Sequence, residues 1–136
     1  MRKVEVYKVE ELRDLYKIQL SLQQKNLNSK IKWALQELAN NVIEYEEKAK
    51  ILLNKNSIIV SIALDSITED SIKIIRASID EIKKNKGNFI KNKSKNNYNY
   101  GGYGLRSIFK MGFSFRMFKT EESVLLICRL KGDYNV

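Results

Sequence analysis

The sequence holds a cluster of residues that could bind a phosphate group. In Gly101-Gly102-Tyr103-Gly104-Leu105, three glycines precede a short apolar run. Glycines let backbone N–H groups approach an anion because no Cβ stands in the way, and a helix that begins there adds the positive end of its dipole. The pattern predicts a phosphate cradle, and an ordinary turn before a helix is the alternative interpretation.

A second group of polar residues lies upstream, in Glu37-Leu38-Ala39-Asn40-Asn41. On a helix, residues four positions apart lie one turn apart on the same side. A carboxylate and an amide would then share the border of an apolar helix face. This pair and the glycine cluster are the two features on which a functional interpretation depends.

The absence of histidine and the presence of a single cysteine exclude several kinds of catalytic and metal site. The chain has no histidine, which removes the commonest general base, the commonest metal ligand and any phosphohistidine. It has one cysteine, Cys128, inside the apolar run 124–128, a pattern typical of a buried strand. Histidine autophosphorylation is excluded, and we expect a core thiol rather than a nucleophile, a disulfide or a zinc site.

The net charge of +9 would usually indicate an anionic partner. Lysine, asparagine, isoleucine and tyrosine are all abundant and proline is absent, a bias that an AT-rich coding sequence produces without selection for binding. Local clustering of lysines therefore carries more weight than the total. Six lysines fall in thirteen residues without an acidic residue: Lys83, Lys84, Lys86, Lys91, Lys93 and Lys95.

Length and apolar content predict one soluble domain over residues 1–136. At 15.9 kDa the chain is long enough for a buried core, but not for a catalytic domain joined to a sensor. No apolar run approaches the ~20 residues of a membrane span. The basic start at residues 1–3 is not followed by the apolar segment and cleavage site of a secretory signal. We expect a cytoplasmic protein with no membrane segment.

Hydrophobic periodicity predicts the elements that must position these residues. Alternation and β-branched runs predict strands at 3–8, 57–64, 113–118 and 124–130. Apolar residues every three or four positions predict helices at 9–24, 29–45 and 69–84, and a short helix from the glycines to about residue 111. The last two strands would form a hairpin, and strand 57–64, ending at Asp65, would be central.

These elements predict an α+β fold, a two-layer α/β sandwich. A mixed, mostly antiparallel sheet of four or five strands would carry the helices on one face. We expect strand 3–8 at a sheet edge. We expect Asn28 or Ser29 to cap helix 29–45, whose apolar stripe would pack on the sheet.

Glu37-x-x-x-Asn41 resembles the N box of the GHKL superfamily, the Bergerat-fold, histidine-kinase-like ATPase domains of gyrase, MutL and sensor histidine kinases. The glycine cluster resembles the second glycine box of that family. A strand that ends in an acid, a helix and a lysine-rich loop lie between them in the family's order, so the resemblance spans roughly residues 30–130. The first strand and helix look more like stand-alone members, such as anti-sigma-factor serine kinases and SiaB-type protein kinases.

The resemblance implies a role for each matching residue in binding ATP and Mg²⁺. Asn41 would hold Mg²⁺ through its amide oxygen, and Glu37 would orient or deprotonate the attacking hydroxyl or water. Asp65 would accept a hydrogen bond from the adenine amino group. The phosphates would meet the glycine cluster under a lysine-rich lid, a set comprising Gly101, Gly102, Tyr103, Gly104, Leu105, Lys93 and Lys95.

One departure from the family pattern concerns the first glycine box. The family has Asp-x-Gly-x-Gly, whereas this chain has Asp65-Ser66-Ile67-Thr68-Glu69, with both glycines replaced. Side chains at these positions would crowd an adenine pocket, although some stand-alone members run directly from this strand into a helix.

Three functions remain open from the sequence. The first is a regulatory kinase that phosphorylates serine or threonine on a partner protein in bacterial-type signalling. The second is a degenerate domain that binds a partner, such as a sigma factor, without catalysis, and the missing glycines favour it. The third is a nucleic-acid-binding domain with Tyr98, Tyr100 and Tyr103 stacking on bases, which is the least favoured. The resemblance also allows a homodimer through the first strand or helix.

Overall fold

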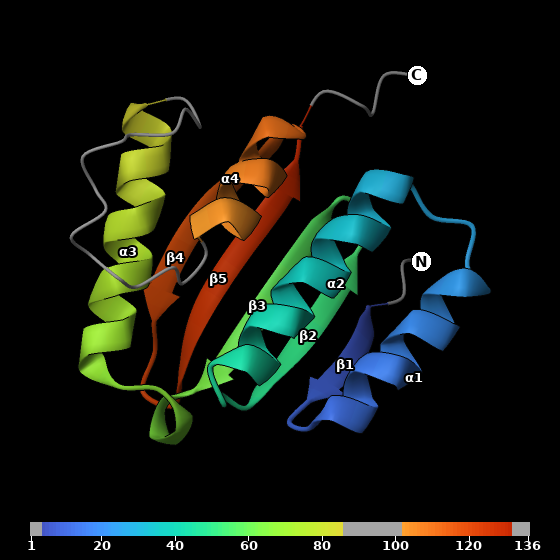
Figure 1. Cartoon of the computed structure of the whole chain (residues 1–136), viewed down its shortest axis with the longest axis horizontal. Coiled ribbons are helices and arrows are strands. Elements are labelled where there is room, and N and C mark those ends of the chain that lie inside the picture. The colour runs from blue at the N-terminus through green and yellow to red at the C-terminus, as the bar shows by residue number, and fades with distance from the viewer. Residues whose placement is uncertain (1–3, 86–101, 132–136) are drawn as a thin grey trace.

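The computed structural model describes residues 4–85 and 102–131 (Figure 1). Most of the predicted helices and strands are confirmed, within a few residues at their ends. In chain order the elements are β1 (Glu5–Val9), α1 (Leu12–Gln23), α2 (Ser29–Glu44), β2 (Ala49–Asn54), β3 (Ser57–Ala63), the single-turn 3₁₀ helix η1 (Leu64–Ser66), α3 (Glu69–Lys84), α4 (Gly102–Lys110), β4 (Phe113–Lys119) and β5 (Ser123–Leu130).

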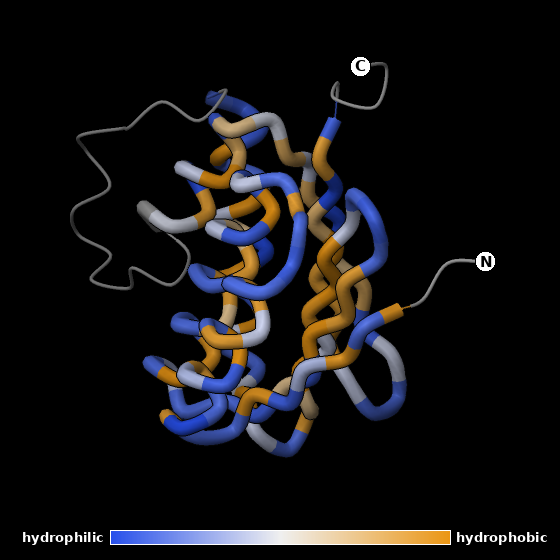
Figure 2. The backbone as a smooth tube through the Cα atoms, turned by 90° about the vertical axis from the view of Figure 1, so that its right-hand side faces the viewer, coloured by the Kyte–Doolittle hydropathy of each residue, from blue (hydrophilic) through white to orange (hydrophobic). Residues whose placement is uncertain are grey.

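The strands form one five-stranded sheet in the order β1-β2-β3-β5-β4, and every neighbouring pair is antiparallel. The helices all lie on one face of this sheet, as the side view in Figure 2 shows. The predicted α+β two-layer sandwich is therefore confirmed. β3 is the middle strand, and β1 is an edge strand, as the sequence predicted.

The strand that the sequence analysis missed is β2. Its residues, Ala-Lys-Ile-Leu-Leu-Asn, include a single β-branched residue and suit a helix as well as a strand. In the sheet, Ala49, Ile51 and Leu53 are buried while Lys50 is exposed. Pairing with both β1 and β3, rather than local propensity, makes this segment a strand.

Alternation in the strands places one set of side chains under the helices. The covered sides of the two adjacent inner strands contribute Ile58, Val60 and Ile62 from β3 and Val124, Leu126, Cys128 and Leu130 from β5, all buried. The thiol of Cys128 is a core group, as expected, and its burial raises its pKa far above the usual value. The cysteine is thus unsuited to nucleophilic chemistry.

No helix formed by residues 4–85 and 102–131 covers the opposite face of the sheet (Figure 2). The pairing register aligns an apolar row across it, formed by Val6, Leu52, Ile59 and Ile127. The charged side chains that the strands place on this uncovered face are all cationic: Lys8, Lys50, Arg116 and Arg129.

None of the helices in residues 4–85 and 102–131 has the length and apolarity needed to cross a membrane.

A Schellman motif ends α2 and turns the chain toward β2. The N–H of Glu46 donates to the carbonyl of Ile43 at 3.1 Å, and that of Glu47 donates to the carbonyl of Val42 at 2.9 Å. Glu46 has a φ of 57°, in the left-handed region that favours glycine. This turn fixes where the helix that carries Glu37 and Asn41 stops.

We expect Glu46→Gly to raise the free energy of unfolding by about 0.5–1 kcal/mol, because glycine adopts the left-handed conformation without a steric penalty. The matched variant Glu44→Gly removes the same charge from the last residue of α2 and should instead destabilise the protein by up to about 1 kcal/mol. Urea denaturation of both variants measures the difference. Equal destabilisation by the two changes would contradict this account of the turn.

Asp14 is buried near the start of α1, where its carboxylate accepts hydrogen bonds from the N–H groups of Glu10 at 2.8 Å and Glu11 at 3.1 Å. Burial acts to raise the pKa of this carboxyl, but the two N–H donors, with the charges of Lys8 and Lys17, outweigh burial and lower it. The ionised form therefore stabilises the start of the helix.

Asp14→Asn should lower the free energy of unfolding by about 0.3–1 kcal/mol at neutral pH, because the amide keeps an acceptor oxygen but loses the negative charge that favours the helix start. Because the folded state lowers the pKa of Asp14, its contribution is present above the unfolded-state pKa near 4 and disappears as the pH falls through the folded-state value. Denaturation curves of the wild type and the variant should converge toward about pH 2. A gap that stays constant with pH would refute the assignment.

Candidate functional site

The contact between α2 and α4 brings together the two groups of residues singled out from the sequence. α4 lies between α2 and α3 on the helical face of the sheet (Figure 1). A Cβ added to Gly104 would lie 3.5 Å from Cγ and 3.6 Å from Oε1 of Glu37, and 3.7 Å from Nδ2 of Asn41. Glu37, Asn41 and Gly104 therefore form one cluster, although they are distant in the sequence.

Two features of α2 hold Glu37 and Asn41 toward α4. The side chain of Asn28 accepts a hydrogen bond from the N–H of Lys30 at 2.7 Å, which confirms it as the cap. The face with Ile31, Leu35 and Leu38 is buried against the rest of the fold. Glu37 and Asn41, one turn apart, are both only partly buried at the border of that face.

Gly104 serves close approach rather than a turn. It lies in the first turn of α4. Among the described residues, the glycine with a positive φ is Gly112, at 108°, which follows the end of that helix. The first N–H groups of a helix have no acceptor within it. A Cβ at Gly104 would be in ordinary contact with Glu37 and Asn41, so the first turn of α4 lies directly beside these two side chains.

The cluster has the chemistry of a site for a phosphate-bound metal ion. Among the residues that the structure describes, neither Glu37 nor Asn41 has a side-chain hydrogen bond or ion pair. Their oxygens are hard donors that suit Mg²⁺, which commonly takes one or two protein ligands and fills its shell with water and phosphate oxygens. The described residues contain no group of three or more acidic or cysteine side chains that could hold a metal without such a substrate.

Asp65 lies beyond the middle strand, in η1, and is exposed. The hydroxyl of Ser66 donates to the carbonyl of Ala63 at 2.8 Å and accepts from the N–H of Lys48 at 2.9 Å, so the turn that carries Asp65 is tied to the chain just after α2. Asp65 is thus at the C-terminal end of α2, whereas the cluster with Gly104 is farther back along that helix.

The structure describes only some of the other residues that were predicted to contact the phosphates. Gly101, Lys93 and Lys95 lie outside the described residues, so the expected lid belongs there too. The backbone of Gly102 and Tyr103 forms the first turn of α4. Leu105 is buried in the core, and as the fourth residue of α4 it follows the three helical residues whose N–H groups have no acceptor within the helix.

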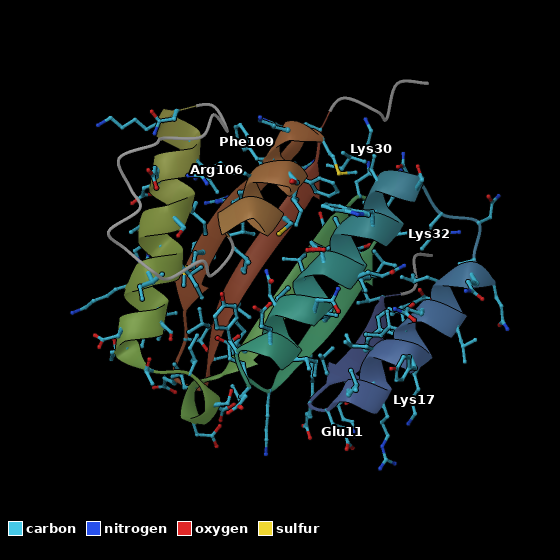
Figure 3. The ribbon with its side chains drawn as sticks, viewed as in Figure 1. Glu11, Lys17, Lys30, Lys32, Arg106 and Phe109 are labelled. Atoms are coloured by element: carbon cyan, nitrogen blue, oxygen red, sulfur yellow. The ribbon has the colours of Figure 1, made fainter. Side chains whose placement is uncertain are left out.

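Arg106, a residue not predicted from the sequence, fixes the other side of α4. Its Nη2 lies 3.8 Å from Oε1 of Glu81 on α3, and both side chains are largely buried. Figure 3 shows Arg106 on the side of α4 toward α3. A single arginine on a short helix gives no pattern from which this role could be read, because its partner lies on a separate helix.

No family model, no curated protein sequence and no solved structure matches this chain. Interpretation of the cluster therefore depends on its own geometry and chemistry.

Substitution of Gly104 tests the closeness of the two helices. Gly104→Ala places a Cβ at ordinary contact distances and should be neutral or stabilise the protein by up to about 1 kcal/mol. Gly104→Val adds methyl groups against Glu37 and Asn41 and should cost about 1–3 kcal/mol in the free energy of unfolding. Urea denaturation of the pair checks this, and a valine variant as stable as the alanine variant would disprove the close contact.

Proposed function

We propose that this protein is a stand-alone GHKL-type protein kinase that binds ATP with Mg²⁺ and phosphorylates serine or threonine on a partner protein. The observation that carries the proposal is the contact of Gly104 in the first turn of α4 with Glu37 and Asn41 of α2. A carboxylate, an amide and an open helix start converge there, which is the set of groups that phosphoryl transfer requires.

Each group has a distinct task in this proposal. Backbone N–H groups in the first turn of α4, those of Gly102, Tyr103 and Gly104, donate to phosphate oxygens. The amide oxygen of Asn41 binds Mg²⁺, which neutralises the negative charge that the phosphates bring beside Glu37. Asp65 accepts a hydrogen bond from the adenine.

Glu37 acts as the general base. Its carboxylate takes the proton of the attacking hydroxyl as the hydroxyl oxygen bonds to the γ-phosphorus, while the bond between that phosphorus and the β-phosphate oxygen breaks and ADP leaves. With no histidine in the chain, a histidine of this protein is excluded as the phosphate acceptor, and the acceptor in this proposal is a serine or threonine hydroxyl of the partner. Arg106 and Glu81 act as positioning residues, because they hold α4 against α3.

A second candidate, the partner-binding module without catalysis, is favoured by the segment after Asp65. Where the family has glycines, this chain places Ile67 and Glu69, and the hydroxyl of Thr68 accepts a hydrogen bond from the N–H of Ser71 at 3.0 Å as the N-cap of α3. Side chains and a helix start thus occupy the segment that borders the adenine site in the family.

Calorimetric titration with ATP, in the presence and absence of Mg²⁺, separates the two candidates. The wild type should bind more tightly with Mg²⁺, and Asn41→Ala should abolish that difference because the metal loses its protein ligand. Glu37→Gln should keep MgATP binding while phosphate release from ATP falls by about 10²–10⁴-fold. Asn40→Ala, an exposed neighbour on the same helix, is the matched control and should behave as the wild type.

Absence of heat at millimolar ATP in a folded wild-type protein would refute the kinase and leave the partner-binding module. Binding that Asn40→Ala and Asn41→Ala weaken equally would place the nucleotide elsewhere.

A further inference from the structure

β4 ends the described sheet on one side, so one of its edges is not paired with another described strand. At its two ends, the N–H of Lys131 donates to the carbonyl of Gly112 at 3.0 Å, and the N–H of Thr120 donates to the carbonyl of Ser123 at 2.8 Å. Antiparallel strands alternate between residues that bond to the neighbour and residues that do not. Counting every second residue between these two ends, the residues whose main-chain groups point to the outer edge are Phe113, Phe115, Met117 and Lys119.

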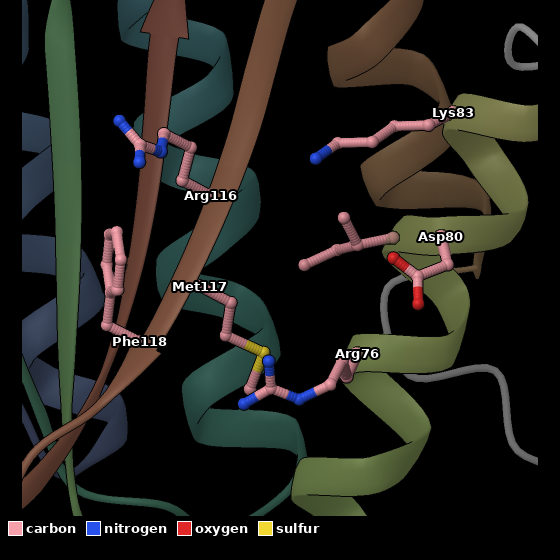
Figure 4. Close-up of a pocket in the computed structure, with 7 residues that line it drawn as sticks. Arg76, Asp80, Lys83, Arg116, Met117 and Phe118 are labelled. Atoms are coloured by element: carbon pink, nitrogen blue, oxygen red, sulfur yellow. The ribbon is translucent and has the colours of Figure 1, made fainter.

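A groove of about 270 Å³ lies between β4 and α3 (Figure 4). Its charged residues are Arg76, Asp80 and Lys83 from α3 and Arg116 from β4, and Met117 and Phe118 contribute apolar surface. This volume is below the ~300–1,000 Å³ that is usual for a small-molecule site. The groove therefore suits the side chains of a docked polypeptide better than a nucleotide.

The groove is electropositive. Arg76, Lys83 and Arg116 are exposed, and none of them forms an ion pair with another described residue. Asp80 is the single acid among the lining residues, so cations outnumber anions three to one. The guanidinium carbon of Arg116 lies 5.2 Å from the ring centroid of Phe118, a cation–π contact that places charge beside apolar surface.

We propose that this groove docks an extended acidic segment of a partner protein, which adds a strand to the outer edge of β4. The main-chain groups of the segment pair with those of Phe115 and Met117, as in other strand additions to sheet edges. Because side chains alternate along a strand, one set of the segment's side chains lies toward Arg76 and Lys83 of α3, and the other lies beside Arg116 and Phe118 on the uncovered side of β4.

A peptide fits the groove better than single-stranded nucleic acid does. The β4 edge offers main-chain donors and acceptors together, which a second peptide backbone matches in both senses. Nucleic-acid sites instead present a series of aromatic side chains for stacking, and the groove has one, Phe118. The proposal is independent of nucleotide binding, because none of its residues belongs to the cluster of Glu37, Asn41 and Gly104.

The test uses fluorescence anisotropy with the full chain and no nucleotide. The probe is a fluorescein-labelled peptide of about ten residues, near the upper length of a strand, in which glutamate alternates with valine. A glutamine–valine peptide is the charge control. A glutamate–valine peptide with N-methyl groups on alternate residues, in each of the two registers, tests for main-chain pairing.

Wild-type protein should bind the glutamate peptide, and Lys83→Glu and Arg116→Glu should each weaken binding by about tenfold, with less effect at high salt. Lys50→Glu makes the same charge change on β2, which β3 and β5 separate from β4, and should leave binding within about twofold. N-methylation in one register, and replacement of glutamate by glutamine, should each weaken binding by about tenfold or more.

Three results would overturn the proposal. The first is no binding of the glutamate peptide to folded wild-type protein, and the second is equal weakening by Lys50→Glu, which would indicate attraction by net charge alone. The third is binding that neither N-methylated register weakens, combined with Arg116-dependent binding of a single-stranded oligonucleotide, which would assign the groove to nucleic acid. Because no nucleotide is added, a failure of the kinase proposal does not change any of these results.

Discussion

The antiparallel pairing of β3 with β5 is the interaction on which the fold depends. It runs from Ser57 opposite Arg129 to Ala63 opposite Ser123 and joins the sheet half formed by β1, β2 and β3 to the hairpin of β4 and β5. A hairpin alone is marginally stable in water, and three or more strands with an apolar face are needed. Joined, the covered sides of β3 and β5 form a continuous apolar floor, and the helices from both halves of the chain pack on it.

The position of the candidate site follows from the apolar surface that β3 and β5 present to the helices. α2 comes from the first half of the chain and α4 from the second, and each buries an apolar face on the sheet, so the polar borders of the two helices meet above it. At that border Gly104 lies in the first turn of α4, so close to α2 that a Cβ there would contact both Glu37 and Asn41. The Glu81–Arg106 pair holds the opposite side of α4 to α3. The arrangement leaves hard oxygen donors beside the helix start without committing them to structural hydrogen bonds, as a site that must accept a charged ligand requires.

A feature could be predicted from the sequence when the residues that produce it are neighbours in the chain. The apolar, β-branched run of β3, the apolar run of β5 and the cap at Asn28 are local signals, and all were identified. β2 was missed because Lys50-Ile51-Leu52 acquires its strand character from neighbours on both sides. Glu37 and Asn41 were recognisable as a pair because four residues make one helical turn. Their contact with Gly104, the Arg106–Glu81 pair and the groove at β4 depend on how separate elements pack, which no local pattern encodes.

The uncovered face of the sheet has a consequence for the behaviour of the protein at high concentration. Its apolar row would favour stacking of two copies, since exposed apolar patches promote association. Every charged side chain that the strands place on that face is cationic, so two copies stacked face to face would bring Lys8, Lys50, Arg116 and Arg129 near like charges. Electrostatic repulsion of this kind weakens as salt screens it, over a Debye length of about 10 Å at 0.1 M ionic strength. The cationic side chains thus oppose self-association of the protein through this face, and their effect weakens as the ionic strength rises. They do not oppose the binding of an acidic surface to the same face.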